Sequence, residues 1–196
     1  MSAWKSNLRP ALTATLIVTV ATGLAYPALV WLPAHVLFAA QAEGSIARRD
    51  GKPVGSYLIA QGVTDSGSFH PRPSAAASGY VGDTSSGSNA GPLNRAFVDT
   101  VVPLRVAAYR ADNGLSPDRP VPASAVAASG SGLDPDITVE NALLQVPRVA
   151  RVRKIDPQVL EAFVWNNAHD KGWNPAALSP VNVLALNLAL DQGHIH

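Results

Sequence analysis

The segment Phe69–Ser74 (FHPRPS) holds residues that could do acid–base chemistry. A histidine such as His70 can act as a general base near neutral pH, and Arg72 can bind an anion. An alternative hypothesis is therefore a membrane-anchored envelope enzyme that uses His70 together with a serine or an aspartate from elsewhere in the chain. In the structural interpretation, the prolines hold the segment extended and the polar side chains bond to loop carbonyls. We predict no catalytic residues, because the sequence contains neither a G-x-S-x-G nucleophile motif nor a cysteine.

Gly130 and Gly132 are the residues whose backbone could approach a phosphate. They precede a predicted helix, where glycines let backbone N–H groups contact an anion. A plain turn explains them better, because no lysine follows and the sequence has no G-x-x-x-x-G-K-[ST] motif. Gln145 lies at the edge of an apolar helical stripe, where a glutamine is usually solvated or bonded to backbone. A nucleotide-binding module around these three residues is therefore an alternative hypothesis.

Two groups of residues carry donors for a metal ion. Asp134 and Asp136 flank a proline just before a predicted helix, where carboxylates also suit the positive helix N-terminus. His194 and His196 stand at the C-terminus, where we expect an exposed and frayed end. We therefore predict no metal site.

A long uncharged segment precedes these residues. Residues 10–42 contain no Asp, Glu, Lys or Arg, and residues 11–32 form an apolar run of about 22 residues, enough for an α-helix to cross a bilayer. We predict an uncleaved membrane anchor. A cleaved signal peptide, with Ala40–Ala42 as its cleavage site, and a buried core helix are the alternatives, although both usually have shorter apolar runs. We expect Pro27 to kink or end the helix near Tyr26.

Residues 55–196 are predicted to form one soluble domain, which a linker over residues 33–54 joins to the span. A net charge of +1 with 15% charged residues argues against nucleic acid as a partner. We interpret the densest basic cluster as a solvated helix face, and its members are Arg148, Arg151, Arg153 and Lys154.

The soluble domain is predicted to mix strands and helices. Strand patterns cover Gly55–Gln61 and Val121–Ala128. The Ser/Gly-rich residues 62–92 predict a long loop, either packed on the domain or a flexible linker. Helical patterns cover Leu93–Asn113, Val139–Lys154, a segment from Pro157, and Asn182–Asp191. The expected caps and breaks of these helices are Gly114, Thr138, Asp156 and Pro103. The fold class is α+β, or α/β if the strands are parallel.

Taken together, these segments resemble the C subunit of the bacterial Kdp-type potassium-transporting ATPase. Each stretch is modest alone, but the set follows the family's order over nearly the whole chain. The stretches are Leu8–Leu12 (LRPAL), Tyr26–Pro27, Gly55–Gln61 (GSYLIAQ), Phe69–Ser74 (FHPRPS), Ser85–Asn89 (SSGSN), Ser129–Pro135 (SGSGLDP), Gln145 with Arg148–Ala150, and Val181–Leu184 (VNVL) with Leu186–Asn187. Ala60, Pro71 and Ser86 depart from the pattern, which has glycine there, and residues 60 and 86 would be strained if those positions need positive φ.

The resemblance implies an accessory, non-catalytic subunit of an ATP-driven potassium uptake complex. One helix would lie in the bacterial inner membrane, with residues 1–10 cytoplasmic and the soluble domain periplasmic. The implied partners are a potassium-channel-like subunit, a P-type ATP-hydrolysing subunit and the lipid bilayer. Small residues of the span and polar residues of the loop would contact the partners, and the candidates are Ala21, Gly23, Ala25, His70 and Arg72.

The family is also described as a catalytic chaperone that raises the pump's affinity for ATP. The resemblance implies nucleotide contact at Gly130, Gly132 and Gln145, and no tightly bound cofactor. A periplasmic domain cannot directly hold cytoplasmic ATP. We therefore expect any effect on ATP to pass through the partner subunits.

Overall fold

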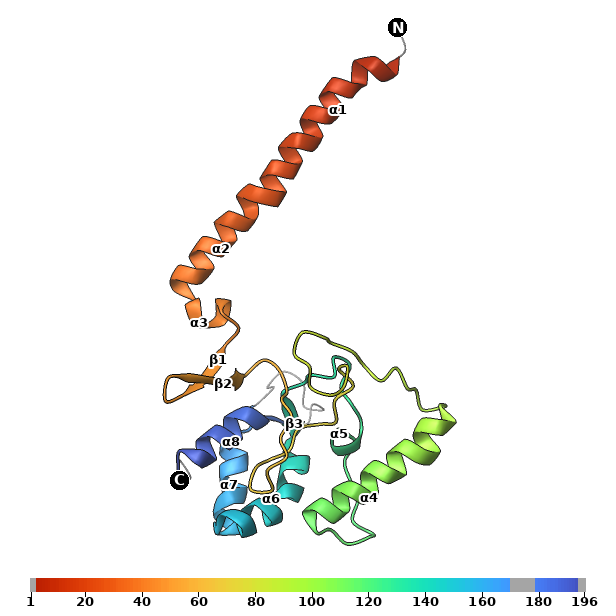
Figure 1. Cartoon of the computed structure of the whole chain (residues 1–196), viewed down its shortest axis with the longest axis vertical. Coiled ribbons are helices and arrows are strands. Elements are labelled where there is room, and N and C mark those ends of the chain that lie inside the picture. The colour runs from red at the N-terminus through yellow and green to blue at the C-terminus, as the bar shows by residue number, and fades with distance from the viewer. Residues whose placement is uncertain (1–2, 170–178, 194–196) are drawn as a thin grey trace. The chain divides into compact units, whose positions relative to one another are not determined.

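The computed structural model describes residues 3–169 and 179–193. The chain divides into two compact units, Met1–Ile46 and Ala47–His196, and each is described by itself (Figure 1). The first unit contains three helices, which are α1 (Ala3–Val20), α2 (Tyr26–Leu37) and the short α3 (Ala39–Ala42). A single π-helical turn, η1 (Ala21–Ala25), joins α1 to α2.

The first unit supplies the expected apolar helix. Among the described residues, one helix, Asn7–Leu37, is long and apolar enough to cross a membrane by its length and composition. The mean hydropathy of its most apolar window is 1.7, and none of that window is buried in the structure. The first unit by itself therefore gives the alternative of a buried core helix no support.

Pro27 neither ends this helix nor breaks it near Tyr26, because α2 continues to Leu37. A proline lacks an N–H, and its ring clashes with the carbonyl four residues earlier. The π-helical turn before it is wider, and the Tyr26 N–H bonds to the Ala21 carbonyl oxygen. This local widening accommodates the proline. The three small residues proposed for partner contact, Ala21, Gly23 and Ala25, all lie in η1.

The strands β1 (Ile46–Arg49) and β2 (Lys52–Ser56) form a two-stranded sheet. Helix α3, β1 and most of β2 therefore occupy residues 33–54, the segment interpreted as a linker. The chain reverses between the strands at Asp50 and Gly51, which both have positive φ.

The strand predicted over Gly55–Gln61 is wrong, because β2 ends at Ser56 and a turn follows. The Ser56 hydroxyl accepts a hydrogen bond from the Leu58 N–H at 3.1 Å. A local side-chain bond of this kind competes with sheet pairing. Residues 62–92 then contain no helix or strand, and the fully buried side chain of Phe69 anchors this loop in the core.

The helix predicted over Leu93–Asn113 is also interrupted by a π-helical turn before a proline. It consists of η2 (Phe97–Val101) and α4 (Val102–Asn113), with Pro103 in the first turn of α4. The Val102 N–H bonds to the Phe97 carbonyl oxygen across the wide turn. The helix ends as predicted at Gly114, whose φ of 65° is left-handed.

The strand predicted over Val121–Ala128 is wrong. Residues Ala123–Val126 form a short helix, α5, in which the Ala125 N–H bonds to the Pro122 carbonyl oxygen at 2.9 Å. A short run of small apolar residues has no periodicity that separates a buried strand from a buried helical turn.

Three helices and a second sheet form the core. Strands β3 (Asp136–Thr138) and β4 (Pro180–Asn182) pair antiparallel, so α+β describes the fold rather than α/β. The helices are α6 (Val139–Arg153), α7 (Pro157–Asn166) and α8 (Val183–Asp191). The buried apolar residues of these strands and helices include Ile137, Val146, Val149, Leu160, Phe163, Val181 and Leu186.

Side chains cap each of these helices. Thr138 accepts from the Asn141 N–H at 3.2 Å, and Asp156 accepts from the Gln158 N–H at 2.8 Å, so both predicted caps are confirmed. The third cap is Asn182, which accepts from the N–H of the third residue of α8 at 3.0 Å. All three bonds are local, which is why the sequence predicts the first two.

An ion-pair triad fastens the first sheet to the core helices. The Asp191 carboxylate, at the end of α8, accepts hydrogen bonds from Arg49 of β1 and from Arg153 of α6, the latter at 2.8 Å. Burial by itself would raise the pKa of Asp191, but the hydrogen bonds from the two guanidinium groups outweigh it and lower this pKa.

We predict that Asp191→Asn lowers the free energy of unfolding by about 1–2 kcal/mol at neutral pH, since the pairs are partly exposed. Because the folded-state pKa of Asp191 is lowered, this contribution is complete above the ordinary carboxyl pKa of about 3.9 and is lost as the pH falls below it. Urea unfolding of the detergent-solubilised chain over a pH series measures both effects. Asp118→Asn, at an exposed turn, is the control. A stability loss that is the same at acid and neutral pH would contradict the prediction.

Candidate functional site

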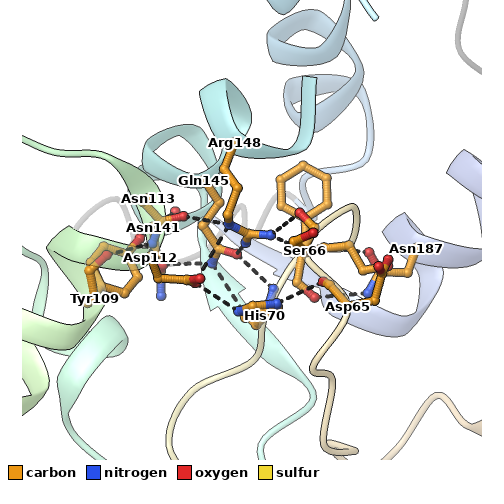
Figure 2. Close-up of polar contacts among 12 residues, drawn as sticks. Asp65, Ser66, His70, Tyr109, Asp112, Asn113, Asn141, Gln145, Arg148 and Asn187 are labelled. Carbon is orange, nitrogen blue, oxygen red and sulfur yellow. Dashed lines mark hydrogen bonds and ion pairs between the residues drawn. The ribbon is translucent and has the colours of Figure 1, made fainter. Parts of the chain in front are cut away.

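A buried guanidinium group lies at the centre of the domain's polar contacts (Figure 2). Arg148, on α6, is only 2% exposed. Its Nη1 donates to the carbonyl oxygens of Ser66 and Ser68 at 2.5 and 2.9 Å. Its Nε donates to Asn113 Oδ1 at 3.0 Å, and its Nη2 donates to Gln145 Oε1 at 2.9 Å. Arg148 therefore joins the loop to both α4 and α6.

The prediction that Arg148 lies on a solvated face is wrong, whereas Arg151 and Lys154 are exposed. A buried charge needs hydrogen-bond partners, and the loop carbonyls that supply them precede Arg148 by 82 and 80 residues. The carboxylate of Asp112 lies 3.7 Å from Arg148 Nε. Burial lowers the pKa of Arg148, and the nearby Asp112 charge offsets part of that effect.

Gln145 has every hydrogen-bonding position of its side-chain amide occupied. Oε1 accepts from the His70 N–H at 2.7 Å and from Arg148. Nε2 donates to the His70 carbonyl oxygen at 3.1 Å and to Asn141 Oδ1 at 3.0 Å. An amide offers two acceptor and two donor positions, so these four bonds complete its capacity. The side chain is 1% exposed, not solvated at the edge of the helix.

Asn187, on α8, bonds both backbone groups of Phe69, as Gln145 bonds both backbone groups of His70. Its Oδ1 accepts from the Phe69 N–H at 2.7 Å, and its Nδ2 donates to the Phe69 carbonyl oxygen at 2.9 Å. Two amides from two helices thus bind two consecutive residues of the loop.

The His70 ring bridges two acceptors. Its Nδ1 lies 3.2 Å from Asp112 Oδ2, and its Nε2 lies 3.0 Å from the Asp65 carbonyl oxygen. A general base needs a ring nitrogen within reach of a nucleophile. Within the described residues, no serine hydroxyl bonds to this ring. An aspartate, Asp112, does meet the ring, and its carboxylate also lies 3.7 Å from Arg148 Nε. The geometry therefore offers no serine nucleophile to the envelope-enzyme hypothesis.

A groove of about 520 Å³ lies beside the histidine, between the loop, α4 and α5. Its polar lining residues are Thr64, His70, Tyr80, Arg105, Tyr109 and Asp112. Protein groups occupy several of them: Tyr109 donates to Asn141 Oδ1 at 2.7 Å, and Arg105 donates to the Val126 carbonyl oxygen at 2.8 Å. Burial raises the pKa of Tyr109, so its hydroxyl stays a neutral donor.

Arg72 fastens the loop to the segment before β3. Its Nη1 donates to Asp134 Oδ2 at 3.1 Å, and its Nε and Nη2 lie 3.4 Å from the Ala127 carbonyl oxygen. The guanidinium of Arg72 thus bonds to protein groups of this segment and not to His70, so the structure does not pair the predicted base with the predicted anion-binding residue.

Gly130 and Gly132 lie in a seam between two Ser/Gly-rich segments. The Ser131 carbonyl oxygen accepts from the Ser86 N–H at 2.9 Å. Gly132 has a φ of 70°, and a Cβ there would lie 2.8 Å from the Ala76 nitrogen and closer still to the Ser86 carbonyl oxygen. Glycine is therefore required for the loop to approach this turn. Gln145 forms its hydrogen bonds with His70, Asn141 and Arg148. The structure therefore does not join Gly130, Gly132 and Gln145 into one nucleotide site.

Ala60 and Ser86, which stand where the resemblance predicts glycine, are not strained by a positive φ, because neither residue has one. Pro71 favours an extended conformation at His70, which suits the two-sided contact with Gln145.

No group of three or more His, Asp or Glu residues that could hold a metal ion occurs in the described parts of the chain. Asp134 pairs with Arg72 and accepts from the Asp136 N–H at 3.1 Å. His194 and His196 lie outside the described residues.

Comparison with known proteins then reveals the family. The protein-family model described as KdpC: K+-transporting ATPase, c chain, matches residues 8–192 of this chain. The chain belongs to the KdpC family. A protein of Mycobacterium tuberculosis named potassium-transporting ATPase KdpC subunit is 46% identical, over 96% of this chain and 99% of the relative. Proteins of the same name are 45% identical in Rhodospirillum rubrum, over 95% of both chains, and 46% in Caulobacter vibrioides, over 95% of this chain and 93% of the relative.

In this KdpC-family chain, the stretches that carry the resemblance meet in space. Phe69–Ser74 contacts Gln145, Arg148 and Asn187, and Ser85–Asn89 contacts Ser129–Pro135. The motifs therefore describe how the long loop is held.

Sequence reasoning missed Asn141 of α6 and Asn187 of α8, which bond to Gln145 and to the Phe69 backbone, and also three residues of α4. Tyr109, Asp112 and Asn113 contact Asn141, His70 and Arg148 respectively. Their spacing of three and four residues places polar groups on one helix face, and this was the one signal that could have indicated a buried polar contact.

We predict that Arg148→Met lowers the free energy of unfolding by about 3–5 kcal/mol, because it leaves the buried Asn113 amide oxygen and the partly buried carbonyl oxygens of Ser66 and Ser68 without this donor. The matched control is Arg151→Met, an exposed arginine on the same helix, which should change stability by less than about 0.5 kcal/mol. Urea unfolding in detergent measures both. Equal effects of the two substitutions would show that the guanidinium contacts do not stabilise the domain.

Proposed function

We propose that this chain is an accessory, non-catalytic subunit of an ATP-driven K+ uptake complex. One observation carries the proposal: among the described residues, a single helix is suited to cross a membrane. One helix cannot enclose an ion path. Transport would therefore belong to a potassium-channel-like subunit and ATP hydrolysis to a P-type subunit, with this chain stabilising their assembly. The relatives' names, potassium-transporting ATPase KdpC subunit, support this role.

We further propose that the chain crosses the bacterial inner membrane once and carries its soluble domain on the periplasmic side. In that topology, cytoplasmic ATP cannot reach the domain. The raised ATP affinity implied by the family would then arise through the partner subunits, with no ATP held tightly by this chain. The filled hydrogen-bonding positions of Gln145 support an indirect effect.

The membrane helix offers a place for a partner helix at η1. Gly23 has no heavy atom within 4 Å of the position that a Cβ would occupy. Together with Ala21 and Ala25, it leaves the backbone accessible to close helix packing. In the soluble domain, His70 and Arg72 hold the 62–92 loop, which we propose covers the outer mouth of the channel-like subunit.

Affinity purification from expressing membranes tests assembly. We predict that the tagged chain recovers both large subunits and that Gly23→Leu lowers their recovery several-fold, because a large side chain separates the helices. Ala14→Leu, a similar enlargement outside η1, is the control. Recovery of the tagged chain as a lone monomer would contradict the proposed function.

Reporter fusions at the C-terminus test the topology. We predict that a reporter active only in the periplasm is active and that one active only in the cytoplasm is silent, because a single span places the whole domain on one side. A fusion after residue 2 should give the opposite pattern. A cytoplasmic C-terminal reporter would overturn the proposed topology and reopen direct contact with ATP.

A further inference from the structure

The loop residues Phe69 and His70 are bound as a β-strand is bound by its two neighbours. In an extended chain, the N–H and C=O of one residue point to one side, and those of the next residue point to the other side. Asn187 of α8 bonds both backbone groups of Phe69, at 2.7 and 2.9 Å, and Gln145 of α6 bonds both of His70, at 2.7 and 3.1 Å (Figure 2). Two side-chain amides therefore replace two neighbouring strands.

The surrounding contacts make this a defined binding site for main chain. The Phe69 side chain is fully buried in the core, and Arg148 bonds the carbonyl oxygens of Ser66 and Ser68 just before it. Pro71 follows and favours the extended conformation at His70. The segment is thus fixed at its backbone and at one side chain.

Gln145 cannot take a further ligand without losing one of these bonds. Its four hydrogen-bonding positions are filled, and its side chain is 1% exposed. Breaking a bond would leave a buried donor or acceptor unsatisfied. A phosphate or a nucleobase would have to displace the His70 backbone, Asn141 or Arg148.

We propose that Gln145 and Asn187 form a double amide clamp whose ligand is the main chain of Phe69 and His70, and that Gln145 acts on the pump through this clamp and not by contact with a nucleotide. The second half of this inference rests on the proposed accessory function. The clamp holds the His70 ring against Asp112 at the groove, so loosening it changes the surface that the loop presents.

Hydrogen exchange tests the clamp on the full-length chain. Gln145→Ala and Asn187→Ala should each speed the exchange of amides in residues 66–72 by about tenfold, because each removes two backbone bonds. In the double variant, the fold increase in exchange rate should be smaller than the product of the two single increases, because both substitutions release the same segment. Gln158→Ala, an exposed amide on α7, is the control.

Asn187→Asp is a milder variant for use if Asn187→Ala does not fold. It keeps the oxygen that accepts from the Phe69 N–H and loses the nitrogen that donates to the Phe69 carbonyl oxygen. Exchange unchanged in Gln145→Ala and in both Asn187 variants overturns the clamp.

The apparent KM for ATP of the purified complex separates the clamp from a nucleotide contact. The clamp predicts that the Gln145 and Asn187 variants raise KM in the same direction and by a similar factor, because both loosen one loop. A KM that rises for Gln145→Ala alone, although Asn187→Ala loosens the loop, overturns the inference in favour of direct contact. A KM that neither variant changes overturns the claim that the clamp acts on the pump. If the wild-type chain does not assemble with the large subunits, the proposed function fails, while hydrogen exchange still decides whether the clamp exists.

Discussion

The requirement that a buried guanidinium group have hydrogen-bond partners organises the soluble domain. Arg148 is 2% exposed, and its partners come from three places: the loop carbonyls of Ser66 and Ser68, Asn113 of α4 and Gln145 of α6. Neutral oxygens with partial negative charge surround the cation, and Asp112 adds a carboxylate at 3.7 Å. Since these partners are far apart in sequence, the charge can be buried only when the loop and both helices are in place. The loop is therefore held by the same bonds that satisfy the arginine.

A long loop without strands or helices must satisfy its backbone groups in other ways. Here side chains and glycine-permitted backbone contacts do so. Asn187 and Gln145 bind the backbone of Phe69 and His70, and the turn at Gly132 approaches Ser86 so closely that a Cβ would not fit. The Ser/Gly-rich composition, which at first suggests flexibility, provides these close approaches. A domain of this kind presents an irregular surface that long-range hydrogen bonds hold in place.

Local signals predicted the helices well and the short strands poorly. Thr138 and Asp156 cap α6 and α7 as expected, because a cap depends on residues within one turn. The predicted strand over Val121–Ala128 is a helical turn, and the one over Gly55–Gln61 ends at Ser56, because short apolar runs carry no decisive period. The prolines at positions 27 and 103 follow π-helical turns.

The sequence by itself determined the apolar span, the caps Thr138 and Asp156, the presence of both helices and strands, and the family, because each depends on neighbouring residues or on the order of motifs along the chain. Tertiary structure alone decided the roles of Gln145, Arg148 and Asn187. Helical periodicity placed Arg148 on a solvated face, because a one-dimensional pattern shows which residues share a face but not what covers it. The covering group is a loop 80 residues earlier, and its backbone oxygens have no signature in residue type. Long-range hydrogen bonds to main chain are therefore what turned apparently ordinary polar residues into the centre of the site.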